Sequence, residues 1–164
     1  MRTSNIPWWR GPRGEWYVVI QVGLFLLVAL GPRTWQGLPE WKYPYDRLGS
    51  IAGTGLMFLG GIFAAAGFFS LGKNLTILPR PRENAMLVET GAYRLVRHPI
   101  YSGLFFAFLG WGLKVHGWLT LGYTILLFIC LDIKARREER WLIARFPEYA
   151  AYRKRVRRLV PFIY

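Results

Sequence analysis

Charge and cysteine are both scarce in this 164-residue chain. Charged residues make up 19% of it, whereas a soluble domain usually carries about 25%. Nine residues are acidic and only one is a cysteine, Cys130, which excludes a disulfide-stapled fold. Two histidines are too few for a histidine-rich metal cluster, and we expect no metal site. The hydrophobic content of 53% and the aromatic content of 17% exclude intrinsic disorder.

The few charges that are present are strongly unbalanced. Lys and Arg total 22 against nine acidic residues, which gives a net charge of +13. An excess of this size is typical of proteins that bind nucleic acid or lie against a membrane surface. The positions of the basic residues along the chain decide between these two partners.

Long stretches without charge predict membrane-spanning helices. Residues 48–72 are 25 residues without a charge, and a helix needs about 20 apolar residues to cross a bilayer. Residues 16–30 form a second uncharged stretch, which is flanked by tryptophans and lacks the small-residue cleavage site of a signal peptide. Residues 100–131 carry a single charge, Lys114, beside a turn signal that ends at Gly117. We expect a tight hairpin of two helices there, each of about 15 residues and about 22 Å long.

These stretches predict an all-α integral membrane protein with four transmembrane helices in a single domain. Residues 1–71 supply two spans, and residues 72–164 supply the short hairpin and the polar segments. The span at 48–72 contains small residues spaced four apart, a pattern that lets helices approach closely, although glycine is also simply common in membrane helices. The pairs are Gly49 with Gly53 and Gly60 with Ala64.

The basic residues fall mainly on one side of these four spans. Three precede residue 16, five lie in 73–99 and ten follow residue 131, so that 18 of the 22 share one side. This positive-inside pattern predicts that both termini and the 73–99 segment are cytoplasmic. The excess is then explained by topology and by contact with lipid headgroups. We expect no nucleic-acid partner, even for the basic run at 153–158.

A loop-like segment, residues 73–92, precedes the hairpin. Its prolines and its glycine predict little regular structure. Loops of this length in small proteins are usually functional, and the alternative is a plain cytoplasmic linker.

The residues after this loop combine charge, aromatic rings and a helix start. Pro99 fits the first turn of a helix, whose free N–H groups attract anions. Arg94 and Arg97 lie three apart and add positive charge to one face. Polar side chains such as His98 and Tyr101 are costly at membrane depth and often functional there, although Arg97 and His98 are equally explained as interface anchors.

A second charged segment follows the hairpin. Acidic and basic residues continue the last helix from Asp132 to Arg140, and they also fit a solvated, ion-paired helix surface. Glu138 and Glu139 point about 100° apart on a helix, so we expect at most one of them to face a site inside the bundle. After Pro147, apolar residues recur at helical spacing and predict an amphipathic cytoplasmic helix against the membrane. This stripe comprises Tyr149, Tyr152, Val156, Leu159 and Val160.

The two polar segments together resemble the isoprenylcysteine carboxyl methyltransferase family, whose pattern the phospholipid methyltransferases share. The first motif is Gly-x-Tyr-Arg-x-x-Arg-His-Pro-x-Tyr-x-Gly at 91–103, and the second is Arg-x-Glu-Glu-x-x-Leu at 136–142. A third, Phe-Pro-Glu-Tyr-x-x-Tyr-x-x-x-Val at 146–156, leads to a Val-Pro-Phe-Ile ending. The loop at 71–81 is similar to that of small prokaryotic members. Residues 1–71 match only as hydrophobic spans.

The resemblance implies methyl transfer from S-adenosylmethionine to a lipidic acceptor, with an isoprenylcysteine-like carboxylate as the favoured one, in a prokaryotic inner membrane. Arginine near the acceptor suits a carboxylate, which needs no base, better than a phospholipid amine, which does. The implied catalytic residues are Arg97, Arg136 and Glu139. The implied cofactor-binding residues are Tyr93, His98, Pro99, Tyr101, Gly103, Glu138, Glu139, Tyr149 and Tyr152.

Three other functions stay open at this point. Phospholipid N-methylation fits the same motifs with an amine as the acceptor. Membrane sterol reductases that use NADPH carry a similar Arg-His-Pro-x-Tyr stretch, although four spans leave little room for a dinucleotide and a substrate chamber. A non-catalytic membrane module is the third, although the intact polar residues of both segments argue against it.

Overall fold

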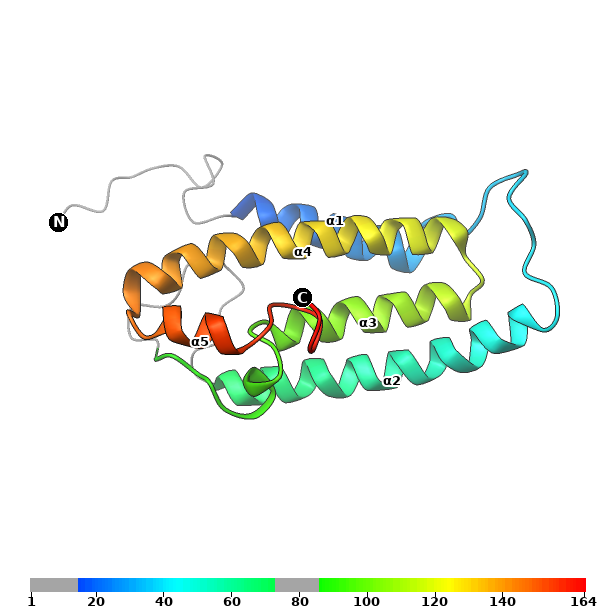
Figure 1. Cartoon of the computed structure of the whole chain (residues 1–164). Helices are drawn as coiled ribbons and strands as arrows, with labels where there is room; N and C mark the ends of the chain where they lie inside the picture. The colour runs from blue at the N-terminus through cyan, green and yellow to red at the C-terminus, as the bar shows by residue number, and fades with distance from the viewer. Residues whose placement is uncertain (1–14, 73–85) are drawn as a thin grey trace.

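The computed structural model describes residues 15–72 and 86–164, and this part of the chain is helical. The helices are α1 (Glu15–Leu30), α2 (Tyr45–Leu71), α3 (Pro99–Lys114), α4 (Trp118–Arg145) and α5 (Tyr149–Arg155), with the 3-10 turn η3 (Gly91–Arg94) before α3. In Figure 1, α1 to α4 lie along one long axis and α5 lies beside one end. The described residues form no strand, only an isolated bridge between Val96 and Arg157, which confirms the all-α expectation for them.

Apolar side chains on the outside of the bundle indicate a membrane protein. Helices α2 and α4 are 27 and 28 residues long and apolar enough to cross a bilayer. Only 17% and 33% of their most apolar windows are buried, unlike the core helix of a soluble protein. Phe58, Ile62 and Phe69 of α2 are exposed by 65–78%. Helix α1 is a shorter apolar helix of 16 residues, and the count of four spans stays a prediction.

The helical hairpin forms where the sequence predicts its turn. Helix α3 ends at Lys114 and α4 begins at Trp118, with His116 in the left-handed conformation (φ 53°) between them. Helix α4 continues without a break through the charged residues, as the sequence predicted, and ends at Arg145. At 1.5 Å per residue α4 is about 42 Å long, so its last turns extend beyond the uncharged part of the bundle.

Glycines bring the backbones of α2 and α3 into direct contact. A Cβ atom at Gly60 would lie 2.5 Å from the amide nitrogen of Ala107, and one at Gly103 would lie 2.4 Å from that of Ala64. A Cβ at Gly53 would lie 2.5 Å from the carbonyl oxygen of Gly110. The small-residue spacing in α2 therefore serves helix packing, the first of the two interpretations that the sequence left open.

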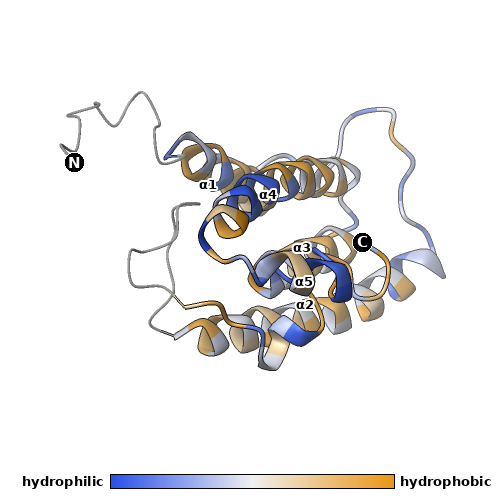
Figure 2. Ribbon diagram, turned by 60° about the vertical axis from the view of Figure 1, so that its left-hand side comes forward, coloured by the Kyte–Doolittle hydropathy of each residue, from blue (hydrophilic) through white to orange (hydrophobic). Residues whose placement is uncertain are grey.

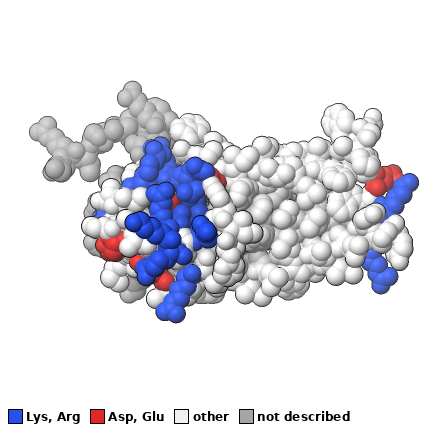
Figure 3. Space-filling view, in the orientation of Figure 1, with Lys and Arg blue, Asp and Glu red and all other residues white. Residues whose placement is uncertain are grey.

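The charges gather at the two ends of the bundle. Figure 3 shows a dense group of Lys and Arg at the end that carries α5 and a small mixed group at the opposite end, with an uncharged band between them. Hydrophilic residues concentrate in α5 and in the neighbouring end of α4 (Figure 2). This arrangement agrees with the positive-inside pattern, whereas the orientation in a membrane stays a prediction.

The helix expected after Pro147 is shorter than its apolar stripe. Helix α5 ends at Arg155, after seven residues. The chain then turns back, so that the backbone amides of Arg97 and His98 donate to the carbonyls of Arg157 (2.8 Å) and Arg158 (3.1 Å). Leu159, expected on the helical stripe, is instead buried in this returning segment with 1% exposure.

Candidate functional site

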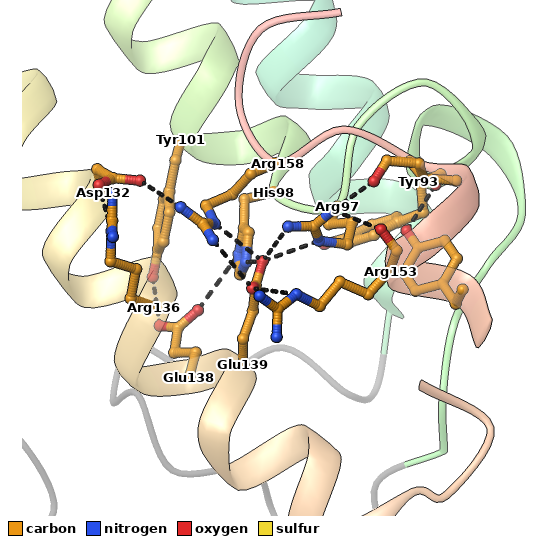
Figure 4. Close-up of polar contacts among 12 residues, drawn as sticks. Tyr93, Arg97, His98, Tyr101, Asp132, Arg136, Glu138, Glu139, Arg153 and Arg158 are labelled. Atoms are coloured by element: carbon orange, nitrogen blue, oxygen red, sulfur yellow. Dashed lines mark hydrogen bonds and ion pairs between the residues drawn. The ribbon is translucent and has the colours of Figure 1, made fainter. Parts of the chain in front are cut away.

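Three separate parts of the chain meet at the charged end of the bundle. The segment before α3 supplies Arg97 and His98, the end of α4 supplies Glu138 and Glu139, and the segment after α5 supplies Arg158 (Figure 4). We call these five residues the charged cluster. Glu139 lies at its centre and is only 2% exposed. The two sequence segments that carry the motifs are thus in direct contact.

Glu139, in the second motif, is held by cations from the first motif, from α5 and from the segment after α5. Arg97 contacts Oε1 of Glu139 with both Nε and Nη2, each at 2.8 Å. Arg158 donates from Nε to the same oxygen at 3.2 Å and from Nη2 to Oε2 at 3.5 Å. Arg153 Nε lies further away, 3.9 Å from Oε2. A buried carboxylate is stable only with such paired and hydrogen-bonded partners.

Arg97 connects the first motif to the segment after α5. Its remaining nitrogen, Nη1, donates to the backbone carbonyls of Arg153, at 3.2 Å, and Val156. Arg97 is 8% exposed, and each nitrogen of its guanidinium has a partner within the protein. The expected role of Arg97 in orienting an acceptor carboxylate would require it to exchange one of these partners.

The imidazole of His98 lies between the two glutamates. Its Nδ1 is 3.5 Å from Oε2 of Glu138, and its Nε2 is 3.3 Å from Oε1 of Glu139. The Nε2 contact is close but its geometry is not that of a hydrogen bond. The expectation that at most one glutamate faces the site was wrong, because both side chains bend toward the ring between them.

We expect His98 to keep its proton to a higher pH than a free histidine does, because its pKa is raised. Burial lowers the pKa of its imidazole, but Glu138 and Glu139 raise it by more, so that the net shift is upward. The resulting stabilisation is complete below the unfolded-state pKa of about 6.5 and is lost as the pH rises through the higher folded-state value. Nitrogen NMR of ring-labelled protein carrying His116→Asn, which leaves one histidine, measures this pKa; a value below that of a free histidine would contradict the prediction.

Tyr101 extends the cluster toward α1. Its hydroxyl donates to Oε1 of Glu138 at 2.5 Å, and its ring stacks on His98 with 5.5 Å between the ring centres. Nζ of Lys134, a residue only 2% exposed, lies 5.1 Å from the Tyr101 ring centre. Lys134 also donates to the amide oxygen of Gln21 at 2.8 Å. Lys134 and Gln21 were not predicted as site residues. The signal for Gln21 is a polar residue within an apolar helix, whereas Lys134 lies in the charged continuation of α4 and carries no such signal.

Arg136 lies outside the charged cluster. Its Nε contacts Oδ2 of Asp132 at 2.7 Å, its Nη2 donates to the Tyr164 hydroxyl at 2.6 Å, and its side chain is 57% exposed. Arg158 links this group to the cluster, because its Nη1 contacts Oδ1 of Asp132 at 3.0 Å while its other nitrogens bind Glu139. Arg158, Asp132 and Tyr164 were not predicted to belong to a site.

Three buried tyrosines lie beside the cluster. The hydroxyl of Tyr152 donates to the backbone carbonyl of Tyr93 at 2.6 Å. The rings of Tyr149 and Tyr152 meet edge to face, with 5.6 Å between their centres. Burial raises the pKa of all three hydroxyls, so they stay protonated. The hydroxyl of Tyr149 is buried and makes no hydrogen bond of good geometry with the described residues, although the Arg97 guanidinium lies near enough to lower its pKa.

Two of the expected cofactor-binding residues pack against α2. Pro99 is buried as the first residue of α3, and a Cβ at Gly67 would lie 2.9 Å from its Cγ. Gly103 faces the backbone of α2 and is not brought to the cluster. Of the expected loop at 73–92, residues 73–85 lie outside the described residues.

The sequence model of the phospholipid methyltransferase family matches residues 48–149, which is more than half of the chain. The chain belongs to this family. The match runs from α2 to the first residue of α5 and thus includes four of the five residues of the charged cluster. Arg158, the fifth, lies beyond it.

Individual relatives are distant and carry different functional names. The chain is 28% identical over 90% of its length to the cobalt-zinc-cadmium resistance protein CzcN of Cupriavidus metallidurans, covering 62% of that protein. It is 27% identical over 63% of its length to the steroid 5-alpha-reductase DET2 of Arabidopsis thaliana, covering 40% of it. It is 28% identical over 66% of its length to the protein-S-isoprenylcysteine O-methyltransferase of Schizosaccharomyces pombe, covering 48% of it. The chain thus spans less than two thirds of each of these relatives.

Proposed function

We propose that this protein is a membrane methyltransferase that transfers a methyl group from S-adenosylmethionine to a lipidic acceptor. The observation that carries the proposal is the charged cluster itself, where both motif segments meet beside an apolar bundle. Membership of the phospholipid methyltransferase family supports the reaction class. The exposed apolar faces of α2 and α4 support an acceptor that reaches the protein from the bilayer.

The side chains around the cluster fit the chemical groups of S-adenosylmethionine. The cofactor carries an ammonium and ribose hydroxyls, which suit Glu138 and Glu139, and a purine, which suits the tyrosine rings. Its carboxylate suits the start of α3, where His98 makes no side-chain cap and leaves the first N–H groups without one. The buried hydroxyl of Tyr149, which makes no well-formed hydrogen bond with the described residues, offers a further contact. We assign Tyr93, Tyr101 and Tyr152 to the same binding region.

The protein's own contribution would be positioning and exclusion of water. When bound, S-adenosylmethionine supplies a methyl group already activated by its sulfonium, so no metal or base is needed for a carboxylate acceptor. Arg97 and Arg158 hold Glu139 in place, which makes them positioning residues. Arg136 has the exposure that a residue contacting an incoming carboxylate needs. We therefore assign the orientation of the acceptor to Arg136 rather than to Arg97.

The acceptor is proposed to be a carboxylate on an isoprenylcysteine-like lipid. The relative from Schizosaccharomyces pombe is named for that substrate, and an accessible arginine beside the cluster fits a carboxylate. A phospholipid amine is the second acceptor class, which the family name supports. Mass spectrometry of a lipid extract, incubated with the protein and a cofactor with a deuterated methyl group, identifies the acceptor directly.

Cofactor binding distinguishes the proposed function from its main competitor. The match to a steroid 5-alpha-reductase favours an NADPH-dependent reductase as the second candidate. Calorimetry of the purified protein in detergent should detect binding of S-adenosylhomocysteine and no binding of NADPH. If the protein bound NADPH alone, the reductase would be favoured over the methyltransferase. If it bound neither compound and transferred no methyl group to any lipid, the proposal would be rejected.

Loss of the hydroxyl should affect the stability of the protein differently at two neighbouring tyrosines. Tyr149→Phe removes a buried hydroxyl that makes no well-formed hydrogen bond with the described residues, so we expect the stability of the free protein to change by less than about 1 kcal/mol while its affinity for S-adenosylhomocysteine falls. Tyr152→Phe, the matched control, leaves the Tyr93 carbonyl without its donor and should cost about 1–3 kcal/mol. Denaturant unfolding and calorimetry measure both effects. Unchanged affinity in Tyr149→Phe would remove this hydroxyl from the proposed site.

A further inference from the structure

The segment after α5 ends in a turn whose apolar side chains face outward. Phe162 and Ile163 are 83% and 78% exposed, although both are large apolar residues. The turn is well fixed: the amides of Leu159 and Val160 both donate to the carbonyl of Tyr164 at 2.8 Å. Outward exposure is therefore a property of a closed turn and not of a loose chain end.

The backbone of this turn is held in an unfavourable conformation. Phe162 has φ 65°, in the left-handed region that bulky residues rarely adopt. Such a residue persists only where its surroundings impose the conformation, and it is a reason to look for a function. Here the result of that conformation is that two neighbouring apolar side chains point away from the protein.

Along the bundle axis, the turn lies at the height where the uncharged part of α4 ends. The hydroxyl of Tyr164 donates to Oδ1 of Asp132 at 3.2 Å, and the Tyr164 ring lies 6.4 Å from that of Phe128. Asp132 is the first charged residue after the uncharged stretch of α4. On α4, Ile129 and Ile133 at this level are also about half exposed, at 49% and 47%. In Figure 1 the red end of the chain has turned back from α5 and lies beside α3.

Basic residues flank the turn on the side away from the apolar part of the bundle. Lys154, Arg155 and Arg157 are exposed and precede it in the chain. An apolar tip with a basic flank at this level matches the interface of a bilayer, where apolar groups enter the acyl region and cations meet headgroups. The occupant that this surface fits is therefore a lipid bilayer.

We propose that residues 156–164 form a membrane-inserted strap, with Phe162 and Ile163 in the lipid and Arg158 fixed at Glu139 by that insertion. Tyr164 connects the two parts, because its hydroxyl binds the Arg158 guanidinium at 3.0 Å as well as Asp132. Arg158 in turn contacts Glu139 at 3.2 Å. The second part of this proposal rests on the proposed function, whereas the insertion itself does not.

Depth-dependent fluorescence quenching tests the insertion. In a Cys130→Ala background, Ile163→Cys is labelled with an environment-sensitive dye and placed in lipid nanodiscs. Lipids with a doxyl group should quench about half of its emission, because an interfacial tip lies about 5–10 Å inside the headgroup boundary. Leu126→Cys on the outside of α4 is the lipid-facing control, and Lys154→Cys is the water-facing one.

Each result of this experiment shows whether the turn is inserted in the lipid. Quenching by doxyl lipids and not by aqueous iodide supports it. Quenching by iodide would place the tip in water and overturn the proposal. Protection from both quenchers would show that a protein surface, such as a second copy of the chain, covers the tip, which also overturns it.

Ligand affinity tests the connection to Arg158. The double variant Phe162→Ser, Ile163→Ser should bind S-adenosylhomocysteine about five- to tenfold more weakly than the wild type in nanodiscs. Equal affinity would show that insertion does not fix Arg158. Failure of the wild type to bind the compound at all would count against the proposed function, while the quenching result would still decide the insertion.

Discussion

Replacing Glu139 with glutamine is expected to lower the free energy of unfolding by about 3–5 kcal/mol, the usual cost of removing one partner of a buried ion pair. The change keeps the shape of the side chain and removes its charge. Arg97 and Arg158 are then left without the carboxylate that both contact, in a place where Glu139 is only 2% exposed. Denaturant unfolding of the detergent-solubilised protein measures the loss.

Glu138→Gln is the matched control for this change. It removes the same charge one residue earlier in α4, from a side chain that is 16% exposed and that contacts His98 and Tyr101 but no arginine among the described residues. Its effect on stability should be less than half of that of Glu139→Gln, because no guanidinium loses its partner. Equal losses in the two variants would show that the contacts of Arg97 and Arg158 with Glu139 add nothing measurable to stability, and that the cluster is not a tightly coupled unit.

Much of the helical architecture follows from local signals in the sequence. The uncharged stretches predict α1, α2 and the hairpin because a helix in lipid must be apolar over its whole length. The turn between α3 and α4 is predicted because glycine and charge interrupt the apolar stretch. The length of α5 could not be predicted in this way. Leu159 continues the helical spacing, but its burial comes from a chain reversal that is fixed by hydrogen bonds to Arg97 and His98.

The candidate site is only partly visible in the sequence. Arg97, His98 and Glu139 lie in short motifs, so the sequence singles them out, and the structure places them in contact. Arg158 stands in a run of basic residues that is equally well explained by topology, and nothing in its spacing relates it to Glu139. The prediction that only one of Glu138 and Glu139 faces the site failed for a different reason. The angle between neighbouring residues on a helix does not fix the direction of a long, flexible side chain.

Adding a single methyl group at Gly60 is expected to separate α2 from α3. The Cβ of Gly60→Ala would lie 2.5 Å from the amide nitrogen of Ala107 and 2.6 Å from the carbonyl of Gly103, and backbone atoms cannot move aside. We expect a loss of about 3 kcal/mol, at the upper end of overpacking effects. Gly61→Ala is the matched control, since no atom of the described part of the chain lies within 4 Å of its added Cβ. Because alanine favours helix over glycine, the control should be neutral or gain up to about 1 kcal/mol.

The same substitution at Gly103 tests whether this glycine serves helix packing or only cofactor binding. A Cβ at Gly103 would lie 2.4 Å from the amide nitrogen of Ala64, so Gly103→Ala should destabilise the free protein about as much as Gly60→Ala. The sequence instead predicts Gly103 as a cofactor-binding residue, in which case affinity would fall while stability stayed unchanged. Unfolding and calorimetry on the two variants distinguish these outcomes. Because α3 begins at Pro99, next to His98, a shift of this helix also moves the imidazole away from Glu139, so we expect loss of stability and loss of affinity together.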